Sequence, residues 1–362
     1  CSLVGSEMCI RDRWYGNDEN VLNWYDNGAE LKAFKGSVIR NENFYFKRCI
    51  TWNDISSSKT GFRFVAGNSI SNASGPSVYD DSEKLFYVLG LCNSKVVEYI
   101  FALTCPTIHF EVGRVAELPV IEENQSTTIA LVKECLQLSR DDWDSFSNSR
   151  DFTTHPLVSM SKGLWDATAT AATMDYYYGY LPEASCPLET CYLLWQGQCK
   201  ERFEKLKANE EELNRIFIDI YGLQDELTPE VEDKDVTVRK ADLQRDIKSL
   251  LSYAVGCMFG RYSLDVPGLV LAGQPFEEKF VHASNAVTGT GVLGAPGLLR
   301  APGALYLRTE DGVKQCTFAP DVDNVIPITD EEYLEDDIIA RLCDWLKVVY
   351  GADTLEANLD YI

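Results

Sequence analysis

Hydrophobic positions between residues 38 and 65 come in short stretches separated by Asn, Asp, Gly and Ser. These stretches are rich in β-branched and aromatic residues, so strands are expected at 38–40, 44–46 and 62–65. From residue 82 the spacing becomes that of one amphipathic helix, which ends before Pro106. Its apolar stripe is Leu85, Val88, Leu89, Cys92, Val96, Val97, Ile100 and Phe101. A further strand is expected at 108–112.

Helical periodicity dominates the rest of the chain. Helices are expected at 126–138, 196–221, 237–260 and 331–350, with an acidic linker from Asp141 to Pro156 after the first of them. Gly222 is placed to end the second helix. The helices at 196–221 and 237–260 are expected to pair as an antiparallel hairpin. The Gly- and Pro-rich stretch 266–312 is expected to be a mobile loop or a strand insertion.

This pattern predicts an α+β fold, with a mixed α/β domain followed by a mainly helical acidic region that carries the Gly/Pro-rich insertion. The expected parts are a first domain at 14–125, a linker and helical spacer at 126–195, a helical hairpin at 196–265, and a C-terminal region with a mobile insertion and an acidic helix at 266–362. Residues 1–13 are expected to be foreign, because Met8-Cys9-Ile10-Arg11-Asp12-Arg13 is what a transposase end sequence used in sequencing libraries would encode. The chain is therefore expected to be a fragment that enters a longer protein near Trp14.

The charge is distributed unevenly. The net charge is −23, but residues 14–121 hold ten Lys/Arg against twelve Asp/Glu, whereas residues 122–362 hold 21 against 42. From Lys32 to Arg63 the sign reverses, with seven cations against Glu42 and Asp54 and with aromatic residues between them. Such a basic, aromatic-rich stretch can bind phosphates. The alternative is the solvated face of a small β domain whose aromatic residues form its core.

Other candidate chemistry is weak. The 12 cysteines include no CxxC pair, so a zinc site at Cys186, Cys191 and Cys199 is less favoured than ordinary thiols, and their dispersal suits a reducing cytoplasm. The GxGxxG string at 289–294 is followed by Ala295-Pro296-Gly297, which breaks the helix that a dinucleotide site needs. No run of about 18 apolar residues predicts a membrane helix. The chain has no GxxxxGK[ST], HExxH, GxSxG or [ND]PPY string.

Several strings, taken in order, resemble one family. They are Trp14-Tyr15-Gly16-Asn17, Lys35-Gly36-Ser37-Val38-Ile39-Arg40-Asn41, Ile50-Thr51-Trp52-Asn53-Asp54-Ile55, Asn93-Ser94-Lys95, Pro106-Thr107-Ile108-His109-Phe110-Glu111-Val112-Gly113 and Asn209-Glu210-Glu211-Glu212-Leu213-Asn214. Together they are similar to the target-recognition and C-terminal helical regions of the PglX family, the adenine-specific DNA methyltransferases of bacteriophage-exclusion (BREX) defence systems. The resemblance covers most of residues 14–362 and is weakest across 266–312.

The resemblance implies a division of labour. The catalytic domain, with its S-adenosylmethionine site, would lie upstream, so no catalytic residue and no cofactor are assigned to this chain. Its partners would be double-stranded DNA, the missing methyltransferase domain and other defence-system proteins, in the cytoplasm and without a membrane. Residues 14–125 would be the target-recognition domain, which selects the adenine that the parent enzyme flips out and methylates at N6.

Residue roles follow from the chemistry of DNA. Arg and Lys suit phosphates and guanine edges, Asn and Ser can read base edges, and Trp52 either packs in the core or touches DNA. The candidates are Lys35, Arg40, Lys47, Arg48, Lys59 and Arg63 for phosphate or guanine, and Asn53, Ser57 and Asn72 as readers.

Two other functions remain open. The chain could be an interaction module or scaffold of a defence complex without DNA contact. It could also be an independent enzyme that uses His109 with Glu111 or Asp54 as acid–base groups, although His109 alternates with apolar neighbours as a packed strand residue does.

Overall fold

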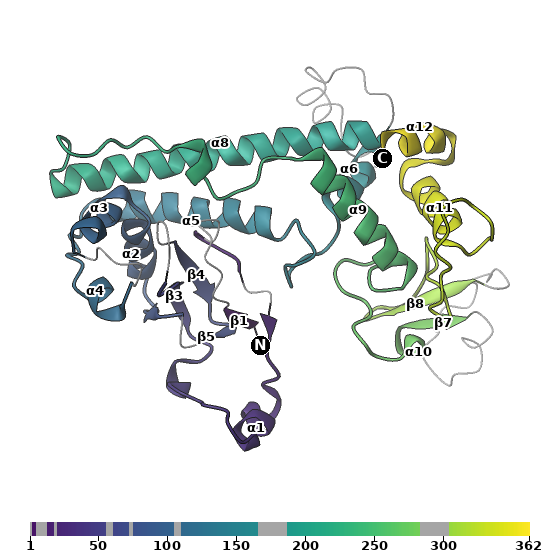
Figure 1. Ribbon diagram of the computed structural model, residues 1–362, viewed down its shortest axis with the longest axis horizontal. Helices are drawn as coiled ribbons and strands as arrows, with labels where there is room; N and C mark the ends of the chain where they lie inside the picture. Colours follow the sequence, from purple (N-terminus) through teal and green to yellow (C-terminus); the bar gives the residue numbers. More distant parts are fainter. Residues whose placement is uncertain are drawn as a thin grey trace. The chain divides into compact units, whose positions relative to one another are not determined.

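The computed structural model describes residues 2–4, 13–17, 20–55, 61–71, 75–104, 110–165, 187–282 and 304–362. They form two compact units (Figure 1). The first comprises 1–144, 148–150 and 199–240, and the second comprises 145–147, 151–198 and 241–362. Helix α8 (Pro187–Tyr221) contributes residues to both units. The expected α+β class is confirmed, whereas the boundaries drawn at 126, 196 and 266 remain predictions.

Two three-stranded sheets lie in the first unit. One has the order β2-β1-β5, and the other has the order β4-β3-β6 with both pairs antiparallel. In the second sheet Ile50 of the central strand faces Phe64 on one side and Val78 on the other. The strands are β1 (Ser2–Val4), β2 (Asn20–Val21), β3 (Arg48–Trp52), β4 (Phe62–Ala66), β5 (Ser69–Ser71) and β6 (Ser77–Tyr79).

The strand expected at 62–65 is confirmed as β4, but those at 38–40 and 44–46 are wrong. Residues 38–40 have no regular structure, and Glu42–Phe44 is a single 3₁₀ turn, η2. Asn41 (φ 56°) and Phe46 (φ 58°) flank this turn in the left-handed region. A strand cannot contain that backbone conformation, so the polar Asn and the chain reversal override the β-rich composition.

The helix expected from residue 82 is two helices, α2 (Lys84–Cys92) and α3 (Lys95–Thr104), with a bend of 63° between them. The apolar stripe is nevertheless buried or partly buried along both helices. Two polar side chains account for the break. The Oδ1 atom of Asn214 on α8 accepts the Lys95 N–H at 2.9 Å and so caps α3, while the Ser94 hydroxyl donates to Leu91 O at 2.7 Å.

The remaining helices of the first unit are α1 (Tyr25–Ala33), α4 (Val112–Ala116), α5 (Gln125–Trp143) and residues 199–221 of α8, with one 3₁₀ turn, η3 (Asp233–Asp235). The strand expected at 108–112 lies partly outside the described residues. In its described part, Phe110 and Glu111 are irregular and Val112 begins α4, so that part of the prediction is wrong.

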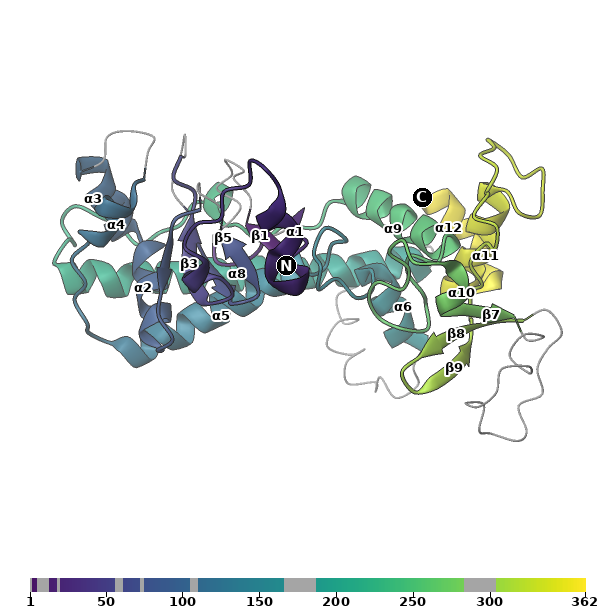
Figure 2. The ribbon, with the colours of Figure 1, turned by 90° about the horizontal axis from the view of Figure 1, so that it is seen from below.

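Helix α5 runs beside α8 (Figures 1 and 2) and is longer than expected. It includes Asp141 and Asp142, which the sequence suggested were the start of an acidic linker. Asp142 is 5% exposed, accepts the Arg239 N–H at 3.1 Å and lies 3.6 Å from Arg202 Nη1. Its carboxylate is therefore internal and paired, which a pattern of consecutive acids could not reveal.

The core of the first unit joins the second sheet to α2, α3, α5 and α8. Trp14 lies in it with 1% exposure, and its backbone continues the sheet by hydrogen bonds to Phe62 O (3.0 Å) and from Phe64 N (2.8 Å). The Trp14 indole donates to Glu210 Oε1 at 2.6 Å, and Arg13, in the stretch expected to be foreign, lies 3.4 Å from the same oxygen.

The second unit is mainly helical with one small sheet. The sheet has the order β7-β8-β9 with antiparallel pairs. Its elements are α6 (Pro156–Trp165), residues 187–198 of α8, α9 (Leu243–Met258), α10 (Phe276–Lys279), β7 (Phe280–His282), β8 (Leu305–Thr309), β9 (Gly312–Gln315), α11 (Ile338–Tyr350), the 3₁₀ turn η4 (Ala352–Thr354) and α12 (Leu355–Tyr361).

The helices expected at 196–221, 237–260 and 331–350 are present as α8, α9 and α11, but their first or last residues differ from those expected. Helix α8 begins nine residues before 196, and it ends as expected at Gly222 (φ 66°), whose N–H donates to Asp219 O at 3.2 Å. Helix α11 begins at Ile338 because the Asp337 side chain accepts the Ala340 N–H at 2.8 Å. The expected hairpin remains a prediction, because most of α8 belongs to the first unit and α9 to the second.

Within the described part of the chain, no single helix is long and apolar enough to cross a membrane. The bent pair α2 and α3 passes on length and composition alone. The GxGxxG string at 289–294 lies outside the described residues.

Candidate nucleic-acid interface

The ten candidate DNA contacts divide into three groups. Ser57, Lys59 and Asn72 lie outside the described residues, as does His109. Lys35, Arg40 and Lys47 are exposed in the segment between α1 and β3. The remaining four, Arg48, Trp52, Asn53 and Arg63, are buried or half-buried in and beside the β4-β3-β6 sheet.

Residues 32–48 form what we call the basic strip, which carries five cations and one carboxylate. Glu42 pairs with Lys32, and Lys32 also lies 5.3 Å from the Trp24 ring. Lys35, Arg40 and Lys47 make no ion pair with any residue that the structure describes. Because their charges are not neutralised locally, these three side chains are available to an anionic partner.

The basic strip also exposes apolar side chains. Phe34 and Val38 are each 69% exposed, and Phe44 and Phe46 are more than 40% exposed. The half-buried Trp24 ring gives the strip its local core, since it packs edge-on against Tyr45 and Phe46 with ring centres 5.2 and 6.3 Å apart. Figure 1 shows α1, whose last two residues begin the strip, on the side of the first unit away from α8. The strip therefore exposes both cations and rings, and Lys47 Nζ lies 5.4 Å from the centre of the Phe44 ring.

Arg48 differs from the other strip cations because the fold already uses it. Its Nη2 donates to Ser82 O at 3.0 Å, and its guanidinium lies over the Phe86 ring at 5.1 Å. The neighbouring Asp80 accepts the Ser82 N–H at 2.6 Å, and this hydrogen bond, helped by Arg48, holds the Asp80 pKa below its ordinary value. Arg48 is thus better suited to fixing α2 against β3 than to meeting DNA.

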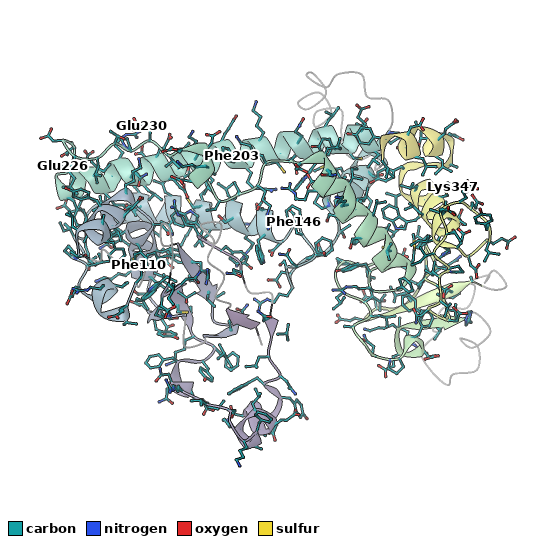
Figure 3. All side chains as sticks on the ribbon, in the orientation of Figure 1. Phe110, Phe146, Phe203, Glu226, Glu230 and Lys347 are labelled. Atoms are coloured by element: carbon teal, nitrogen blue, oxygen red, sulfur yellow. The ribbon has the colours of Figure 1, made fainter. Side chains whose placement is uncertain are left out.

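Trp52 takes the first of its two expected alternatives, a place in the core. It is fully buried, and its indole donates to Phe110 O at 2.8 Å. Phe110, labelled in Figure 3, lies next to α4. Arg63 is 1% exposed, and its Nη2 donates to Asn53 Oδ1 at 2.8 Å. Arg63 thus orients Asn53, and both Trp52 and Arg63 lie inside the unit rather than on its exposed surface.

Sequence patterning could not separate these groups. Alternating aromatics and cations look alike whether they face the core or water, so the pattern left open whether Phe34, Phe44 and Phe46 belong to a binding surface or to the core of a small β domain. It also passed over Tyr25, which is 86% exposed at the start of α1. Its neighbours Asp26 and Asn27 have left-handed backbone angles. The Asp-Asn-Gly turn at 26–28 was the available signal for an irregular, outward-facing start of this helix.

Metal chemistry finds no support in the described part of the chain, where no group of three or more His, Cys, Asp or Glu side chains could hold an ion. Cys191 and Cys199 are buried and form no disulfide with any described residue, and Cys186 lies outside the described residues.

The second unit contains a pocket of about 530 Å³, whose lining can be compared with what S-adenosylmethionine would need. Its lining includes Arg261, Gln274 and apolar side chains but no carboxylate. The ribose hydroxyls of a nucleoside cofactor call for an acidic partner, and the sulfonium of S-adenosylmethionine would be repelled by Arg261. This pocket therefore does not fit S-adenosylmethionine.

The chain is similar in sequence to adenine-specific methyltransferases of two bacteria. The chain is 35% identical over 360 residues to the adenine-specific methyltransferase PglX of Lacticaseibacillus casei (strain Zhang), an alignment that covers 97% of this chain and 26% of that protein. It is 28% identical over 368 residues to the adenine-specific methyltransferase BrxX of Escherichia coli O9:H4 (strain HS), again with 97% and 26% covered. No protein-family model matches the chain.

The chain thus spans about a quarter of the length of these curated relatives. Along nearly all of its own length, it is a PglX-like sequence.

Proposed function

We propose that this chain recognises the target DNA sequence for a site-specific adenine-N6 DNA methyltransferase in phage defence, and that it is not itself catalytic. The observation that carries the proposal is the exposure of Lys35, Arg40 and Lys47 without an ionic partner among the described residues. The chain as a whole has a net charge of −23, so a local surface with positive charge favours an anionic ligand. Both relatives are adenine-specific methyltransferases, which makes DNA the natural candidate.

The basic strip would contact phosphates and set the register of the chain on the duplex, because phosphate contacts position a protein without reading sequence. Base reading would fall to Asn53 and to Ser57 and Asn72, which lie outside the described residues. Asn53 is the best supported of these, because Arg63 fixes the direction of its side-chain amide. An amide held in one orientation loses less conformational entropy when it meets a base edge.

The chemistry would be supplied by the rest of the longer protein. S-adenosylmethionine would provide the methyl group there, and this chain would decide which adenine reaches it. Eight cysteines in the described residues form no disulfide, which suits the reducing cytoplasm, where cellular DNA would be modified.

A protein-interaction module is the second candidate function. The exposed rings of the basic strip favour it, since large exposed apolar side chains also mark protein interfaces. DNA recognition requires the exposed cations of the strip, whereas an interaction module without DNA contact does not require them for duplex binding.

The test is duplex binding by the whole chain across a salt series, with Lys35→Ala, Arg40→Ala and Lys47→Ala combined. If all three contact phosphates, the slope of log K against log salt should become shallower by about 2.7, at about 0.9 per contact. The control removes equal charge elsewhere, with Lys200→Ala, Lys234→Ala and Lys248→Ala, and should leave the slope unchanged. Equal slopes for the triple variant and the unmodified chain would reject the strip as the phosphate-binding surface and favour the interaction module.

A further inference from the structure

A second exposed segment has the opposite charge. Residues 321–336, which we call the acidic ribbon, carry seven carboxylates and no cation. They form no helix or strand, and their carboxylates make no ion pair within the described residues. The ribbon also presents apolar side chains to solvent, with Ile328 87% exposed, Tyr333 67% and Val325 65%.

The backbone of the acidic ribbon is held in place despite its irregular path. At its start Asp321 N–H donates to Met258 O at 2.7 Å, and in its middle Pro327 O accepts the Ile338 N–H at 2.9 Å. At its end the buried Asp337 side chain accepts the N–H groups of Tyr333 (2.6 Å) and Leu334 (2.9 Å). A segment fixed in this way loses little conformational entropy when its outward-facing side chains meet a partner.

The basic strip is the complement of the ribbon in both charge and apolar character. The two segments have similar lengths, 17 and 16 residues, and carry net charges of opposite sign. Each exposes side chains that could pack together, Phe34 and Val38 on the strip and Val325 and Ile328 on the ribbon. Complementary potential with an apolar centre is what a specific protein interface requires.

We propose that the acidic ribbon of one copy of this chain docks on the basic strip of a second copy, giving head-to-tail association. Because the two surfaces differ, the contact is heterologous, and each copy keeps a free strip or ribbon unless a ring closes. The ribbon offers the strip carboxylates where DNA would offer phosphates, so a duplex that binds the strip should dissociate the copies. The association itself does not depend on DNA binding.

The experiment measures the mass of the nucleic-acid-free 362-residue chain by sedimentation over a range of concentration and salt. Three variants are compared. The strip variant carries Lys35→Glu, Arg40→Glu and Lys47→Glu, and the ribbon variant carries Asp330→Lys, Glu331→Lys and Glu335→Lys. The matched control reverses three exposed carboxylates of the first unit, Asp225→Lys, Glu226→Lys and Glu230→Lys, two of which are labelled in Figure 3.

The unmodified chain and the control should associate, and raising the salt from low to high ionic strength should weaken that association by about tenfold or more. The strip and ribbon variants should each be monomeric alone but should associate when mixed, because each supplies the surface that the other lacks. Misfolding could not produce that rescue. A chain that stays monomeric at low salt and high concentration, or a mixture of the two variants that fails to associate, would overturn the proposal.

Discussion

Asn93 and Phe62 are joined by a reciprocal pair of hydrogen bonds between a helix junction and a strand. The Phe62 N–H donates to Asn93 Oδ1 at 3.0 Å, and Asn93 Nδ2 donates to Phe62 O at 2.9 Å. The same carbonyl accepts the Trp14 N–H at 3.0 Å. The side chain of Asn93 thus imitates a strand edge and fastens the bend between α2 and α3 to the sheet that carries Asn53 and the end of the basic strip.

Replacement of Asn93 by Ala should therefore destabilise the first unit. Two hydrogen bonds at about 1 kcal/mol each predict a loss of about 2 kcal/mol in the free energy of unfolding. Urea unfolding followed by tryptophan fluorescence would measure it. Asn93→Asp retains the acceptor for the Phe62 N–H but sets a carboxylate oxygen against the Phe62 carbonyl, so it should be at least as destabilising as Asn93→Ala. Equal stability of Asn93→Ala and the wild type would mean that this pairing does not hold the junction.

Trp52→Phe separates a core role from a DNA-binding role. The substitution removes the hydrogen bond to Phe110 O and leaves space in a fully buried site, so it should cost about 2–4 kcal/mol of stability. Duplex affinity of the protein that remains folded should not change. Weaker DNA binding with unaltered urea unfolding would contradict the buried position and restore Trp52 as a DNA contact.

Removal of the Asp142 carboxylate would leave two arginine side chains without the negative charge that they face. With Asp142→Ala, Arg202 and Arg239 lose the carboxylate that they face, and the expected cost is about 3–5 kcal/mol in the free energy of unfolding. The neighbouring Asp141 is exposed, and Asp141→Ala serves as the control, with a change within about 0.5 kcal/mol. Comparable unfolding curves for the two variants would show that Asp142 is not an internal ion-pair partner.

His155 should make the second unit sensitive to acid. It is 3% exposed, and its Nδ1 accepts the Leu157 N–H at 3.3 Å at the start of α6. Burial lowers the pKa of His155 to about 3, so the folded imidazole stays neutral while the unfolded one gains a proton below about 6.5. Its contribution to stability is therefore complete above pH 6.5 and is lost as the pH falls towards 3.

Between pH 7 and pH 5 the loss from His155 alone should be about 2 kcal/mol. His155→Asn keeps a side chain that can accept the Leu157 N–H but does not titrate in this range. The difference in unfolding free energy between the wild type and this variant should therefore shrink by that amount on acidification. A difference that stays constant from pH 7 to pH 5 would show that the imidazole is not held neutral.

The sequence correctly predicted those features that depend only on residues close together along the chain. The apolar stripe from Leu85 to Phe101 is buried or partly buried, and Gly222 ends α8, because periodicity and a left-handed glycine need no distant partner. The bend could not be foreseen, since the residue that caps α3, Asn214, lies 119 residues from Lys95. The contact that fastens the bend to the sheet joins Asn93 to Phe62, 31 residues away. Position along the chain says nothing about such contacts.

The sequence was likewise unable to show which candidate DNA-binding residues are exposed. The stretch from Lys32 to Arg63 was identified by charge, but charge alone could not distinguish Lys47, which is exposed, from Arg63, which lies inside the sheet. A buried guanidinium is costly unless it is hydrogen-bonded, and its partner Asn53 is known only once β3 and β4 are paired. Which cations reach solvent is thus set by tertiary structure.

Selection of the whole chain on a pool of random duplexes at moderate salt would show whether this chain reads DNA. We expect enrichment of one short sequence that contains an adenine, and we expect the Lys35, Arg40 and Lys47 triple variant to lose affinity for that sequence and for unrelated duplexes alike. A chain that is folded but enriches no sequence, or that binds no duplex even at low salt, would contradict this expectation.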